Sequence, residues 1–166
     1  MGLLEMRIAV VTVDPYLDTP VVVLEERDGG GRAVPIWIGQ AEAVAIVASV
    51  QGIPMARPMT HDLLRDALAA TGATVTSVDI VDLREGTYYA TVRLETANGA
   101  ASLDARPSDA IALALRTKSP IRVTEEVVER AATVQIDRPA PVAIAGDVSP
   151  DLLASLRDEA FPKWKM

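Results

Sequence analysis

Three acidic residues lie in the first turns of three predicted helices, next to side chains that could do chemistry. Glu42 lies in the first turn of the first helix, Asp62 follows His61 at the start of the second, and Asp109 lies in the first turn of the third. A carboxylate in this position stabilises the helix macrodipole by about 0.3–1 kcal/mol, so each acid alone has a structural explanation. His61 is the only histidine in the chain and therefore the only side chain with an unperturbed pKa near neutrality.

The same helix starts could instead form one functional site. Backbone N–H groups at helix N-termini bind anions, and carboxylates bind hard divalent cations such as Mg²⁺ or Mn²⁺. Arg106, beside Ser108 at the third helix start, could neutralise a phosphate, and His61 could act as general acid or base. His61 could equally be a partly exposed surface residue. The metal ligands of such a site would be Glu42, Asp62 and Asp109.

The first half of the chain predicts a three-stranded meander followed by two helices. Isoleucine and valine recur between turn residues in three segments, 6–14, 20–26 and 33–38. Residues 40–50 are apolar nearly all round and predict a helix buried on most sides. Thr60 is expected to cap a second helix over 61–71. Its inward residues are expected to be Leu63, Leu64, Ala67 and Leu68.

The second half repeats this order. Three more strands are expected at 74–83, 87–96 and 101–105, the last after an Asn-Gly hairpin turn. Pro107 begins another apolar helix, and a short strand at 121–123 leads to a short helix through Ala131. Residues 40–46 and 107–113 match in size and charge. We therefore predict an α+β fold with a mixed, mainly antiparallel sheet, buried helices and a duplicated β-β-β-α unit.

Beyond this core the composition changes. Residues 138–141 (RPAP) are linker-like, and Ser149-Pro150-Asp151 precedes an amphipathic stretch with Leu152, Leu153 and Leu156. We predict one domain over 1–132 and a C-terminal appendage over 133–166 with a short helix.

Composition excludes several classes of site. The 166 residues carry a net charge of −7 and include no cysteine, which rules out disulfides, cysteine nucleophiles and cysteine-based zinc sites. No basic surface for nucleic acid or acidic lipid is expected, so any phosphate binding must be local. The first residues lack a basic segment followed by a long apolar run, and we expect a cytoplasmic protein without a membrane segment.

Four motifs in order resemble the bifunctional nuclease family. They are PIWIG at 35–39, RPMTHDL at 57–63, GTYYA at 86–90 and ARPSDAIALA at 105–114. The resemblance spans about residues 6–131. It implies an α+β fold that forms oligomers, here expected to be homodimers, and activity on both DNA and RNA. The family more often has phenylalanine where this chain has Tyr88.

The resemblance points to Glu42, Arg57, His61, Asp62, Arg106, Ser108 and Asp109. We expect the catalytic residues to be His61, Asp62, Arg106 and Asp109. Arg57, Ser108 and Tyr89 are expected to bind substrate, Tyr89 by stacking on a base, because neighbours on a strand face opposite sides and only one of the two tyrosines can be exposed. The leading hypothesis is a nuclease with little sequence preference. The alternative is a non-catalytic oligomeric regulatory domain that binds a small anionic or nucleotide ligand.

Overall fold

The first half of the chain folds into a three-stranded antiparallel meander and a helix. The computed structural model describes residues 2–131 and 147–148. The elements of this first unit are β1 (Leu3–Asp14), β2 (Thr19–Glu26), β3 (Ala33–Trp37) and α1 (Gln40–Val50). A further helix, α2 (Thr60–Ala70), follows α1 after a loop.

The second unit has the same order of elements, which confirms the predicted three-strand-and-helix repeat. Its elements are β4 (Thr74–Arg84), β5 (Thr87–Thr96), β6 (Gly99–Ala105) and α3 (Pro107–Thr117). A short strand and helix come next, β7 (Ile121–Thr124) and α4 (Glu125–Ala131). A two-residue strand, β8 (Asp147–Val148), pairs with β1 in parallel and was not expected from the sequence.

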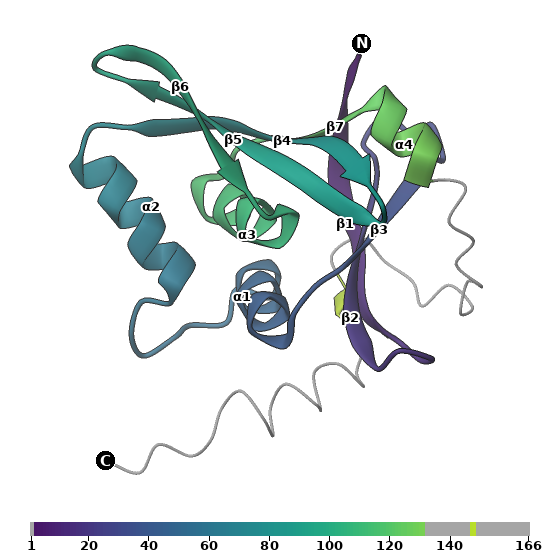
Figure 1. The fold of residues 1–166 in the computed structure, drawn as a ribbon. Coiled ribbons are helices and arrows are strands. Elements are labelled where there is room, and N and C mark those ends of the chain that lie inside the picture. Colours follow the sequence, from purple (N-terminus) through teal and green to yellow (C-terminus); the bar gives the residue numbers. More distant parts are fainter. Residues whose placement is uncertain (1, 132–146, 149–166) are drawn as a thin grey trace.

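One mixed sheet joins the two units in the order β3-β2-β1-β7-β4-β5-β6. β7 lies at the centre, antiparallel to β1 and parallel to β4, and the meander pairs are antiparallel. The predicted mixed, mainly antiparallel α+β fold is therefore confirmed. The sheet bends around α1 and α3, and α2 lies outside α3 (Figure 1).

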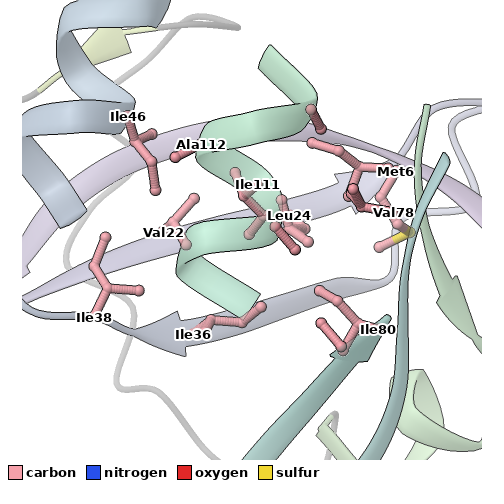
Figure 2. Packing of buried hydrophobic residues seen from close by; sticks show 14 of the residues in the cluster. Met6, Val22, Leu24, Ile36, Ile38, Ile46, Val78, Ile80, Ile111 and Ala112 are labelled. Atoms are coloured by element: carbon pink, nitrogen blue, oxygen red, sulfur yellow. The ribbon is translucent and has the colours of Figure 1, made fainter. Parts of the chain in front are cut away.

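The core lies between the sheet and the two helices α1 and α3. Val22 and Leu24 of β2, Val78 of β4 and Ile111 of α3 are all 0% exposed and belong to one apolar cluster (Figure 2). Both helices are rich in alanine, all but Ala41 of these alanines are buried, and the two helices contact each other. Small side chains allow the two helices to approach closely, which brings their N-terminal ends together.

Two sequence expectations about α2 are wrong. Leu63 and Leu64 are 65% and 39% exposed instead of facing inward. The helix turns a stripe formed by His61, Arg65 and Leu68 toward the protein, because polar contacts with α3 fix its rotation. The expected cap at Thr60 is also displaced by one residue: Met59 precedes the first helical residue, and its N–H donates to the Asp62 carboxylate at 2.8 Å.

The start of β1 also differs from the prediction. β1 begins at Leu3 instead of residue 6, because Leu3 and Leu4 pair with Thr124 and Val123 of β7. The predicted linker at 138–141 and the helix beyond Asp151 lie outside the described residues. In the part of the chain that is described, none of the helices has the length and apolar character to cross a bilayer.

Candidate active site

The first turns of α1, α2 and α3 meet in a cluster of four ionisable side chains. His61 Nε2 lies 2.9 Å from Asp109 Oδ1. Arg106, the residue before α3, donates from Nε to Asp109 Oδ2 at 2.8 Å and from Nη2 to Glu42 Oε1 at 2.6 Å. We call His61, Asp109, Arg106 and Glu42 the helix-start cluster. It contains four of the eight residues predicted from the sequence for the site.

Asp109 connects the members of this cluster. Its burial would raise the pKa of the carboxyl, but the hydrogen bonds from Arg106 and His61 outweigh burial and hold that pKa below its ordinary value. The two carboxylates, Asp109 first, in turn raise the pKa of Arg106. Asp109 is therefore ionised at neutral pH, and it orients both the imidazole and the guanidinium.

His61 is buried, with 8% of its surface exposed, so the alternative of a partly exposed surface histidine does not hold. An ionised Asp109 accepts a hydrogen bond, so Nε2 carries the proton in the neutral imidazole. The other ring nitrogen, Nδ1, is buried and has no hydrogen-bond partner among the described residues. Nδ1 then has a free lone pair, which is the chemical requirement for a general base.

Asp62 belongs to a different contact, although it is adjacent to His61. Its Oδ1 accepts a hydrogen bond from Arg116 Nε at 2.7 Å, and its Oδ2 accepts the Met59 N–H that caps α2. Burial would raise the pKa of Asp62, but these two hydrogen bonds outweigh it and lower that pKa. Asp62 therefore fixes the start of α2 and its position on α3.

Arg116 is the residue that the sequence interpretation missed. Its side chain is only 5% exposed, and Nη1 donates to the carbonyl oxygens of Ala45 and Ala112 at 3.1 and 2.9 Å. The available signal was one charged residue directly after the apolar run 110–115, in the last turn of the helix. A buried arginine needs an acidic partner, and Asp62 supplies it.

The three predicted substrate-binding residues lie in three different places. Arg57 is exposed and lines a cavity that Asp62 also lines, whereas no member of the helix-start cluster does. Ser108 is buried at the second position of α3. Tyr89 is 37% exposed on the face of β5 away from α3, where Arg84 lies 5.0 Å from its ring centre.

The structure also locates the predicted metal ligands. Glu42 and Asp109 share Arg106, whereas Asp62 is bound to Arg116. Among the described residues, no three histidine, aspartate or glutamate side chains are grouped so that they could hold a metal ion. The protein thus offers at most two carboxylates at the helix-start cluster.

The fold and the cluster define an α+β domain with a histidine–aspartate pair and an arginine at its helix starts. The family model of the bifunctional nuclease domain matches residues 22–135. The match covers the described helices and most of the sheet, and the chain belongs to this family.

Some individual relatives carry the name of the same family. A protein of Mycobacterium tuberculosis named only as uncharacterized is 42% identical over 146 residues, which are 86% of this chain and 87% of that protein. Bifunctional nuclease 1 of Arabidopsis thaliana is 31% identical over 113 residues, 66% of this chain. Bifunctional nuclease 2 of Oryza sativa subsp. japonica is 29% identical over 137 residues, 81% of this chain. The chain spans 35% and 42% of the lengths of these two plant proteins.

Proposed function

We propose that the protein is a nuclease that hydrolyses phosphodiester bonds of DNA and RNA at the helix-start cluster. The observation that supports this best is the His61–Asp109 contact of 2.9 Å, with Arg106 on the other oxygen of the same carboxylate, in a member of the bifunctional nuclease family. A base, its orienting acid and a phosphate-binding cation are the groups that phosphodiester hydrolysis requires.

Each residue has a distinct role in this proposal. Asp109 orients His61, and Nδ1, which is buried in this structure, accepts a proton from the attacking water only after the substrate complex admits water to it. The resulting imidazolium can then protonate the leaving oxygen. Arg106 has a side chain that is 66% exposed, and the N–H groups that it does not use on Asp109 and Glu42 can donate to phosphate oxygens. These contacts involve phosphate and not base edges, which is why little sequence preference is expected.

The charge of the cluster favours a divalent cation as a further participant. With a neutral imidazole, two carboxylates and one guanidinium give the cluster a net negative charge, which repels a phosphodiester. Mg²⁺ is often held by only one or two carboxylates together with substrate phosphate and water. We propose that Mg²⁺ or Mn²⁺ enters with the substrate on Glu42 and Asp109, without Asp62.

A cleavage assay tests the proposal. Purified protein is incubated with single-stranded and duplex DNA and RNA, with and without chelator, beside the variants His61→Asn and Asp109→Asn. Glu5→Gln is a matched control, because Glu5 is an exposed carboxylate on β1 that pairs with Arg27, outside the helix-start cluster. We expect losses of about 10²-fold or more in the first two variants, no loss in the control, and cleavage that stops with chelator and returns with Mg²⁺ or Mn²⁺.

Other outcomes would contradict the proposal. Equal cleavage by wild type and both cluster variants would mean that the activity comes from a contaminant. No cleavage, together with a higher melting temperature in the presence of a nucleotide, would favour the alternative of a binding domain without turnover. Cleavage that persists in chelator would rule out the metal. Homodimer formation and a cytoplasmic location remain predictions.

A further inference from the structure

A cavity next to the helix-start cluster has the composition of a phosphate site. It has a volume of about 510 Å³ and lies between the end of α1, the loop that follows it, the first turns of α2 and the last turn of α3. This volume is within the range of roughly 300–1,000 Å³ that is common for small-molecule sites. Three arginines and one carboxylate line it, namely Arg57, Arg65, Arg116 and Asp62.

One of these arginines, Arg57, has no acidic partner among the described residues, and a second, Arg65, is paired but 41% exposed. Asp62 neutralises Arg116, and Arg65 pairs with Asp66, which lies outside the cavity. Arg57 makes no ion pair in the described part of the chain, whereas each of the other arginines described there has an acidic partner. In a chain with a net charge of −7, this cavity therefore concentrates positive charge locally.

Hydrogen bonds hold the wall of the cavity in place. Arg116 is held by Asp62 and by the carbonyl oxygens of Ala45 and Ala112, so its guanidinium is a fixed part of the wall. The loop that forms the opposite wall turns at Gly52, whose φ is +59°, and Ile53 N–H donates to Ala48 O at 2.9 Å. A fixed wall lowers the ordering cost of binding.

The remaining lining favours a ligand with an apolar part as well as a phosphate. Ile53 is 39% exposed, and half-buried Met55 lies beside it on the same loop. Such side chains offer apolar contact to a planar base or a sugar, and a flexible methionine adapts to more than one base. A ligand that was only an inorganic anion would leave these contacts unused.

We propose that this cavity binds one nucleotide of the substrate strand, with the phosphate on Arg57 and Arg65 and the base against Ile53 and Met55. The choice of a nucleotide rests on the proposed nuclease function. Asp62, which lines the cavity, follows His61 in α2, and Arg116 of the cavity lies seven residues, about 10 Å along α3, from Asp109 of the cluster. The cavity thus positions a nucleotide near the bond to be cut and compensates for the acidic charge of the chain.

Titration calorimetry at low salt tests this inference with three probes: adenosine 5′-monophosphate, adenosine and inorganic phosphate. We expect the monophosphate to bind more tightly than either of the others. Arg57→Gln and Arg65→Gln should each weaken it by about tenfold, the size of one charge-assisted hydrogen bond. Arg27→Gln is the matched control, because Arg27 is exposed, pairs with Glu5 and does not line the cavity.

The outcomes separate this inference from the proposed function. His61→Asn should abolish cleavage and leave the affinity for the monophosphate unchanged, because His61 does not line the cavity. Nucleotide binding that needs Arg57 in a protein without nuclease activity would refute the proposed function alone. No binding by the wild type, equal affinity in Arg57→Gln and Arg27→Gln, or phosphate binding as tight as that of the monophosphate would overturn the inference.

Discussion

Replacing Asp62 should mainly lower stability, because this carboxylate neutralises the buried Arg116. Arg116 would keep its bonds to two carbonyl oxygens and lose its counter-charge, and its side chain is only 5% exposed. Leaving one charge of a buried pair without its partner costs about 3–5 kcal/mol. Asp62 is 22% exposed, so part of this cost is screened by solvent, and we expect about 3 kcal/mol for Asp62→Ala.

Urea unfolding followed by circular dichroism measures this loss. The exposed Asp66→Ala is the control and should stay within about 0.5 kcal/mol of wild type. The double variant Asp62→Ala/Arg116→Met should recover part of the loss, because it removes the unpaired buried charge as well. A single variant Asp62→Ala as stable as Asp66→Ala would refute the structural role assigned to this ion pair.

The same pair predicts a pH dependence. The folded-state pKa of Asp62 is lowered, so its contribution to stability is complete above the unfolded pKa of about 3.9. The contribution is lost as the pH falls through the lower, folded-state pKa. The stability difference between wild type and Asp62→Ala should therefore be constant near neutrality and shrink below about pH 4. A difference that grows with acidification would contradict this sign.

Further predictions concern the rest of the fold. Asp79 is 1% exposed and binds Arg122 at 2.7 Å, so Asp79→Asn should cost roughly 2–3 kcal/mol in urea unfolding. Ile111→Ala, at a fully buried position, should cost about 2–5 kcal/mol. Leu63→Ala, at a position that is 65% exposed, should cost less than about 0.5 kcal/mol. Equal costs for the two variants would contradict the observed rotation of α2. Gly99→Ala should lower the melting temperature, at a cost of about 1–2 kcal/mol, because Gly99 has a φ of +102°.

The secondary structure was predictable because each element has a strong local pattern. α1 spans the predicted residues 40–50, and Pro107 begins α3 as expected, because apolar runs and cap signals act within a few residues. In β5, which matches the predicted strand 87–96, Ala90, Val92 and Leu94 are buried on one face, as the twofold period of a strand requires. The start of β1 was less predictable, because it depends on pairing with β7, more than a hundred residues away.

The candidate site was predictable only in part. The position of Glu42, His61 and Asp109 at helix starts indicated a shared cluster, and their contacts through Asp109 and Arg106 form one. Asp62 has the same local signal and yet bonds to Arg116. The difference is one of side-chain direction. Neighbouring side chains on a helix point about 100° apart, so when His61 faces Asp109, Asp62 faces a different part of α3, where Arg116 lies.

The sequence by itself determined where the helices begin, which acids occupy their first turns and which strands follow one another, because capping and periodicity are local. Only the tertiary structure decided which face α2 turns inward, that Arg116 is buried against Asp62 while Arg57 makes no ion pair in the described structure, and that a cavity opens between them. Those outcomes depend on the crossing of helices that are far apart in the chain. Whether an arginine is buried in an ion pair or exposed without one depends on which side chains the packing of these helices places beside it.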